Sequence, residues 1–121
     1  MPIFDVEIVT RHQEPLQPAL AGDLADALGS VMEAVPGKVW VRLRSLPSDG
    51  YAENGVGADR PFPVFVTLTA SAPPEGEHLD HFVRQVTEAV ARLADRPPEN
   101  VHVLVAPAAK GHVAFGGKVV R

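Results

Sequence analysis

Alternating apolar and polar positions open the chain and predict a strand over residues 2–9. Its apolar set is Phe4, Val6 and Ile8, which would all point to one side of the strand. The same period of two recurs in three later segments, over residues 38–46, 62–69 and 101–105. Each of the four strands is therefore expected to bury one face.

Apolar residues spaced by three and four predict two amphipathic helices. The first has Pro15 in its opening turn and extends to Val35, where Pro36-Gly37 stops it. The second extends from Glu75 to about Asp95 and ends before Pro97-Pro98. The segment Ala109–Gly117 after the last strand is rich in turn residues and is read as a turn or a short hairpin.

The two halves of the chain match at an offset of 62 residues, which takes Val39 to Val101 without a gap. The apolar helix positions coincide under the same offset: Leu20 with Phe82, Leu24 with Val86 and Leu28 with Val90. We therefore expect one α+β domain over residues 1–121, with pseudo-repeats over about 2–60 and 61–121. Two tandem βαβ units would form a four-stranded mixed sheet with both helices on one face.

The other face of this sheet is mixed in character. Strand parity assigns to it Asp5, Glu7, Trp40, Arg42, Arg44, Phe65, Thr67, Thr69 and His102. Two interpretations stay open. The face can meet water, with Arg42 and Arg44 pairing across strands with Asp5 and Glu7. Alternatively it packs against other copies of the chain around a central axis, which Trp40 and Phe65 favour because large aromatics are rare on a bare surface.

Composition excludes several classes of protein. The net charge of −4 argues against nucleic acid as a partner, and the lack of cysteine excludes disulfides and thiolate metal sites. His78 and His81 are three residues apart on a helix without further ligands, so no metal is expected. No membrane-spanning run or signal pattern is found, and the default expectation is a cytoplasmic protein.

Three features together carry a resemblance to a known family. They are Pro2 after Met1, the duplicated βαβ unit, and the segment Ala109-Lys110-Gly111-His112 followed by Gly116-Gly117. The chain resembles the tautomerase superfamily, the family of 4-oxalocrotonate tautomerase and macrophage migration inhibitory factor. The resemblance implies an enzyme without a cofactor, an isomerase of the tautomerase type, assembled as a homotrimer.

In that family the amino-terminal proline is the catalytic acid or base, and Pro2 holds this position here, provided that Met1 is removed. Burial and nearby arginines would lower the pKa of such an amine, so that it is neutral near pH 7 and takes a proton α to a carbonyl. The matching position of the second repeat is Val64, which has no free amine. A trimer would thus contain three sites rather than six.

The resemblance also indicates a set of substrate-binding candidates. The family's first carboxylate-binding arginine falls on His12 without gaps, beside Arg11. The second falls on Trp40, with Arg42 and Arg44 further along the same strand face. The family's pocket aromatic falls on Tyr51. Lys110 and His112 are interpreted as turn or interface residues.

The implied reaction is keto–enol tautomerisation of a small carboxylate-bearing enol or dienol. Related dehalogenases, hydratases and decarboxylases need a carboxylate to activate water, and Glu53, Asp49 and Asp59 in the central loop are candidates. The same strand and helix order also fits a ferredoxin-like ligand-binding module without catalysis.

Overall fold

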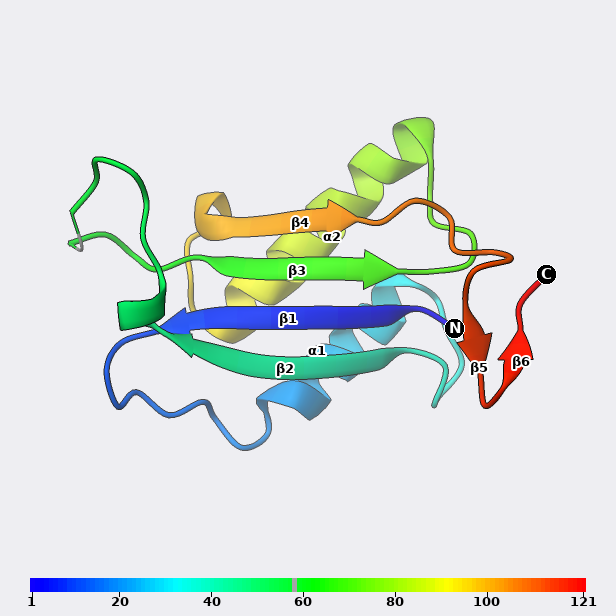
Figure 1. Ribbon diagram of the computed structural model, residues 1–121, viewed down its shortest axis with the longest axis horizontal. Helices are drawn as coiled ribbons and strands as arrows, with labels where there is room; N and C mark the ends of the chain where they lie inside the picture. The colour runs from blue at the N-terminus through cyan, green and yellow to red at the C-terminus, as the bar shows by residue number, and fades with distance from the viewer. Residues whose placement is uncertain (58) are drawn as a thin grey trace.

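Two strand–helix–strand units build the protein in the computed structural model, which describes residues 1–57 and 59–121. The elements in chain order are β1 (Ile3–Thr10), α1 (Leu20–Val31), β2 (Trp40–Pro47), η1 (Ser48–Gly50), β3 (Val64–Thr69), α2 (Gly76–Ala94), η2 (Pro98–Asn100), β4 (Val101–Val105), β5 (Ala114–Phe115) and β6 (Lys118–Val119) (Figure 1). The last two strands form a hairpin over residues 114–119, which begins inside the predicted turn segment and ends beyond it.

The four long strands form one mixed sheet in the order β2-β1-β3-β4. β1 is parallel to β2 and β3 is parallel to β4, whereas the two central strands, β1 and β3, are antiparallel. Val6 lies opposite Leu43 on one side and opposite Val66 on the other. The predicted fold class, with a parallel pair in each repeat, is confirmed.

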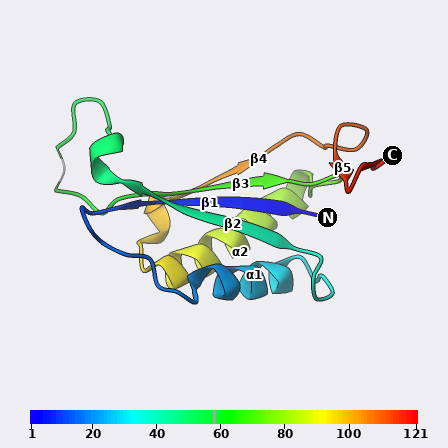
Figure 2. The same ribbon diagram turned by 60° about the horizontal axis from the view of Figure 1, so that its bottom comes forward.

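Both helices cover the same face of the sheet, as Figure 2 shows. The side chains that the strand alternation assigned to this face are buried on the two central strands, with Phe4, Val64, Val66 and Leu68 at 0% exposure. Those of the edge strands, such as Val41, Leu43 and Val103, are half-buried. α1 contributes Leu20, Leu24 and Leu28, and α2 contributes Phe82, Val86 and Val90. Burial of these apolar side chains is the main favourable term in folding this domain.

The first helix is shorter than predicted. Pro18 disfavours a helical conformation for the residue before it, so α1 begins at Leu20 rather than in the turn of Pro15. At the other end Glu33 has a φ of +52°, a left-handed conformation that ends the helix before Val35. The strand predicted over residues 38–46 is shifted to Trp40–Pro47. The strand predicted over residues 62–69 begins two residues later, at Val64, and ends at Thr69 as predicted.

The sheet face away from the helices carries the predicted ion pairs. Arg42 donates from Nε and Nη2 to the two carboxylate oxygens of Asp5, at 2.6 and 2.9 Å. Arg44 is more distant, with its Nε 3.8 Å from a carboxylate oxygen of Glu7. The hydrogen bond from Arg42 lowers the pKa of Asp5 below its ordinary value, against the opposing effect of partial burial.

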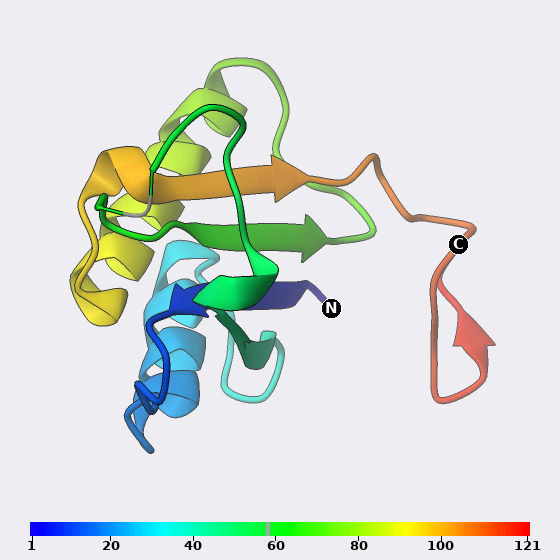
Figure 3. The ribbon, with the colours of Figure 1, turned by 60° about the vertical axis from the view of Figure 1, so that its left-hand side comes forward.

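Two irregular segments stand at opposite ends of the sheet. The segment from η1 to β3 lies at the end where β1 finishes, on the side away from the helices (Figures 2 and 3). The β5–β6 hairpin lies at the other end, where the chain begins (Figure 1). The sheet therefore separates two groups of candidate residues.

Candidate functional site

Pro2 is held at the start of the sheet. Its carbonyl accepts a hydrogen bond from the backbone N–H of Trp40, at 3.1 Å, which extends the β1–β2 ladder by one residue. The Trp40 indole is anchored in turn, since its Nε1–H donates to the carbonyl of Gly37 at 3.1 Å. Phe115 of the hairpin packs edge-on against this indole with ring centroids 5.3 Å apart. Pro2 thus lies half-buried beside an aromatic pair.

Arg11 and His12 lie at the opposite end of β1. Both are exposed, in a turn closed by Glu14, whose carboxylate accepts from the Arg11 backbone N–H at 2.9 Å. The eight residues of β1 separate this turn from Pro2. At a rise of about 3.3 Å per residue the strand spans about 26 Å. A single chain therefore does not bring Pro2 together with either residue.

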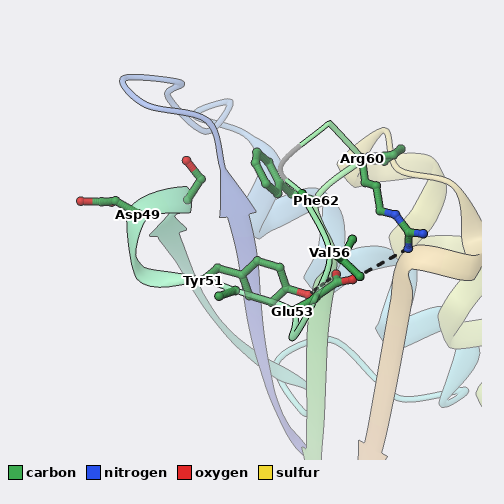
Figure 4. Close-up of a pocket in the computed structure, with 10 residues that line it drawn as sticks. Asp49, Tyr51, Glu53, Val56, Arg60 and Phe62 are labelled. Atoms are coloured by element: carbon green, nitrogen blue, oxygen red, sulfur yellow. Dashed lines mark hydrogen bonds and ion pairs between the residues drawn. The ribbon is translucent and has the colours of Figure 1, made fainter.

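Tyr51 lines a cavity of about 360 Å³ at the same end as Arg11. Figure 4 shows this cavity, with the phenol of Tyr51 directed at Glu53. The Tyr51 hydroxyl donates to Glu53 Oε2 at 2.5 Å. This hydrogen bond, with a smaller contribution from burial, raises the pKa of Tyr51 to about 12. Near neutral pH the phenol is a hydrogen-bond donor and not a base.

The remaining wall of the cavity is largely apolar. The described residues that line the whole cavity are Ser48, Asp49, Tyr51, Ala52, Glu53, Val56, Gly57, Arg60, Pro61 and Phe62. The rings of Tyr51 and Phe62 meet edge to face at 6.5 Å, and Tyr51 lies 6.1 Å from Phe65 on the open sheet face. Of the three carboxylates expected in the central loop, Glu53 and Asp49 line this cavity and Asp59 lines the neighbouring groove.

Two arginines at this end were missed in the sequence. Arg60 lines the cavity, with Nη1 3.9 Å from Glu53 Oε1. Arg96 donates from its guanidinium to the carbonyls of Val9, Phe62 and Ala94, at 2.9, 3.0 and 3.0 Å. Neither residue belongs to a periodic segment or to the family resemblance, so no sequence signal distinguished them from other charged residues.

The other predicted binding residues are distributed along β2 and the tail. Arg42 and Arg44 lie mid-strand on the open face, engaged with carboxylates of β1. Trp40 stands at the Pro2 end. Lys110 and His112 lie in the turn before β5, held by backbone hydrogen bonds to Ser71 and Ala109. The structure thus places the predicted site residues in three regions of the sheet. They are the end at Pro2, the row of Arg42 and Arg44 along β2, and the opposite end, the Arg11–Tyr51 end.

Residues 1–57 and 59–121 contain neither a candidate metal centre nor a candidate membrane span. Nowhere in that part of the chain do three or more histidine, cysteine, aspartate or glutamate side chains gather in a way that could hold a metal ion. In the same residues, neither helix has the length and apolar character that crossing a bilayer requires.

Comparison with known proteins identifies the family. A family model described as "Tautomerase enzyme" matches residues 65–121. Two curated relatives, both 2-hydroxymuconate tautomerases of Pseudomonas putida, are 37% identical over 43 residues, which are 36% of this chain and 68% of each relative. The chain belongs to the tautomerase superfamily. Membership supports an activity of the tautomerase type, an isomerisation, in general terms.

Solved tautomerase-superfamily structures share the whole fold. A fused 4-OT superposes with a TM-score of 0.76 at 16% identity, covering 97% of this chain and 94% of its own. MIF2 of Leishmania major superposes with a TM-score of 0.74 at 13% identity, covering 98% and 97%. At these identities the likeness concerns the fold alone. The family match begins at residue 65, one position after Val64, and lies within the second repeat, whereas Pro2 belongs to the first repeat.

Proposed function

We propose that this protein is a cofactor-independent keto–enol tautomerase for a small carboxylate-bearing enol or dienol, with the amine of Pro2 as general acid and base. The observation that carries the proposal is the fixed position of Pro2, whose carbonyl is bonded to Trp40 N–H. An amine held in place by the sheet can take a proton from one carbon of the substrate and return it to another. Removal of Met1 is a requirement, because only then is the Pro2 nitrogen an amine.

The complete site would draw on two subunits. Pro2 and the Arg11–Tyr51 end lie about 26 Å apart along one chain, far beyond the size of a small enol. A second copy that brought its Arg11–Tyr51 end to Pro2 would complete the site, with the amine from one subunit and the cations for a carboxylate from the other. In this arrangement each trimer has three sites, because Val64 has no terminal amine to offer.

A homotrimer is consistent with the open sheet face. This face exposes Trp40 at 40% and Leu104 at 54%, and it contains the row Tyr51, Phe65 and His102. Covering these apolar and aromatic groups would be favourable. The solved relatives include a fused 4-OT described as a symmetric trimer. Analytical ultracentrifugation at several concentrations tests the expected trimer.

The test of function is an activity assay combined with a check of the amino terminus. Phenylenolpyruvate and 2-hydroxymuconate are converted from enol to ketone, and the change in ultraviolet absorbance gives the rate. Intact-mass spectrometry establishes whether Met1 is absent. Pro2→Ala is expected to lower kcat at least a hundredfold, because general acid–base catalysis contributes about 10²–10⁴ in rate.

Pro98→Ala is the matched control, since Pro98 is exposed in the turn between α2 and β4. This variant should keep the wild-type rate. A wild-type chain with a free Pro2 that shows no rate above buffer would refute the proposal. A ligand-binding module without catalysis would show equal binding before and after Pro2→Ala and no turnover in either.

A second reaction deserves a separate assay because Glu53 lines the cavity beside Tyr51. A carboxylate there can accept a hydrogen bond from water and direct it at a substrate, as hydration or dehalogenation requires. Haloacrylates with chloride detection, and proton NMR of the products, distinguish this reaction from tautomerisation. Glu53→Gln should abolish water addition but leave proton transfer by Pro2 intact.

A further inference from the structure

The cavity at the Tyr51 end has one cation among its described lining residues, Arg60. The other ionisable side chains that line it are hydrogen-bonded or negatively charged. The Tyr51 hydroxyl is bonded to Glu53 at 2.5 Å, and Asp49 and Glu53 repel an anion. An anionic ligand in this cavity would therefore be attracted to Arg60 in particular.

Arg60 is also placed between two hollows. It lines the apolar cavity of Tyr51 and the adjoining polar groove that contains Arg11, Glu14 and Arg96. Figure 4 shows its guanidinium reaching toward Glu53 across the mouth of the cavity. A ligand lying on Tyr51 and Phe62 would thus have its polar end beside Arg60.

Arg60 and Arg96 differ in how firmly they are engaged. The Arg96 side chain is 14% exposed and donates to three backbone carbonyls. Its guanidinium donors are therefore already used within the protein. The Arg60 side chain is 64% exposed, and its pair with Glu53 is long, at 3.9 Å. An exposed pair of this kind contributes little, so exchanging Glu53 for another carboxylate has a small cost.

We propose that Arg60 binds the carboxylate of the substrate by taking it in place of Glu53, and that it determines the preference for charged over neutral enols. Because this inference rests on the proposed function, it concerns the same site, with Pro2 supplied by a second subunit. The apolar part of the substrate would lie on Tyr51, Val56 and Phe62. The guanidinium presents two parallel N–H donors, which suits a carboxylate.

The proposal also accounts for the two arginines of the open sheet face. Arg42 is bound by both of its donors to Asp5, and Arg44 lies between Asp5 and Glu7. A substrate carboxylate on the open face would have to compete with these two acidic side chains. Arg60 has one acidic partner at long range, which makes it the more available cation.

The test compares a charged and a neutral form of one substrate. Phenylenolpyruvate and its methyl ester are assayed with the wild type, Arg60→Ala and Arg60→Lys. Arg60→Ala should raise KM for the acid about tenfold, the factor that corresponds to about 1.4 kcal/mol, with kcat within about twofold. The ester should show the same KM in all three proteins. Arg60→Lys should recover part of the affinity, since it keeps the charge but loses the paired donors.

Glu53→Gln provides a change in the opposite direction. It removes the competing carboxylate, so KM for the acid should fall, by about two- to threefold, while the ester is unaffected. Arg84→Ala, at an exposed position of α2, is the matched control and should leave both constants unchanged. Equal effects of Arg60→Ala on acid and ester, or no effect on either, would overturn the proposal.

Failure of the proposed function can be recognised separately. If the wild type has no turnover, binding of cinnamate and of neutral cinnamamide is measured by saturation-transfer NMR. Weaker binding of cinnamate alone in Arg60→Ala would support the carboxylate site even though the tautomerase proposal had failed. Identical binding of the two probes to wild type and Arg60→Ala would refute the Arg60 inference.

Discussion

Arg96 offers a quantitative test of how the Arg11–Tyr51 end is held together. Its guanidinium joins the end of β1, the segment before β3 and the end of α2 through the carbonyls of Val9, Phe62 and Ala94. The left-handed conformation of Asp95, with a φ of +55°, turns the chain out of α2 immediately before Arg96. Arg96→Met keeps an apolar stem of similar length but removes all three donors.

The expected loss follows from these contacts. A hydrogen bond to a charged group contributes about 1.5–3 kcal/mol, and a buried carbonyl left without a donor costs about 1–3 kcal/mol. The side chain is 14% exposed, so water can replace part of what is lost. The lower values are therefore appropriate, and Arg96→Met should reduce the free energy of unfolding by about 3–4 kcal/mol.

Urea unfolding followed by the fluorescence of Trp40, the single tryptophan, measures this loss. With an m-value of about 2 kcal/mol/M the midpoint should fall by about 1.5–2 M and m should stay constant. All variants are compared at one protein concentration, because assembly would stabilise the folded state. Arg84→Met, at an exposed position of α2, should change the free energy by less than about 0.5 kcal/mol.

A loss below about 1 kcal/mol for Arg96→Met would refute the reasoning, since it would mean that water satisfies all three carbonyls equally well. Arg96→Lys separates charge from geometry. An ammonium has the charge but reaches fewer of the carbonyls, so an intermediate loss is expected. A lysine variant as stable as the wild type would show that the charge, and not the shape of the guanidinium, matters.

Three further results are expected. Tyr51 is the single tyrosine, so absorbance near 295 nm after a pH jump reports on it alone; its midpoint should lie near 12 and return toward 10.0 in Glu53→Gln. The hydrogen bond from Arg42 lowers the pKa of Asp5 below its ordinary value of 3.8, so the pair stabilises the fold above pH 3.8. This stabilisation is lost as the pH falls through the lowered pKa. The difference in Tm between wild type and Asp5→Asn should therefore disappear in acid. Leu24→Ala should cost about 2.5–4 kcal/mol in urea unfolding, because Leu24 is fully buried between α1 and the sheet.

The sequence predicted most of the architecture because its signals are local. A period of two in four segments and a period of three to four in two others determine which side chains meet in the core. The offset of 62 residues showed that this pattern occurs twice, and the parallel pairing within each repeat follows from the βαβ connection. Strand parity also placed Arg42 and Asp5 on one face of the sheet, and the register of the folded strands sets them opposite each other.

Helix boundaries were less predictable. The apolar spacing from Leu16 to Val35 continues beyond both ends of α1, since Leu16 packs against the core without being helical. Pro18 and the left-handed Glu33 override the pattern locally. Periodicity reports which side chains are buried, and a residue outside a helix can be buried as well.

Tertiary structure alone decided which candidate residues share a site. The extension of β1, which the alternation predicts, separates Pro2 from Arg11, whereas only the folded chain brings Arg11 into the groove that Arg60 and Arg96 line. Arg96 meets Val9 and Phe62, 87 and 34 residues away, and no local pattern encodes such a contact. The sequence by itself determined two βαβ units and the position of Pro2 at the start of the first strand. The grouping of Tyr51, Glu53 and Arg60 arose only when the chain folded, because a loop without periodicity takes its shape from the groups that it meets.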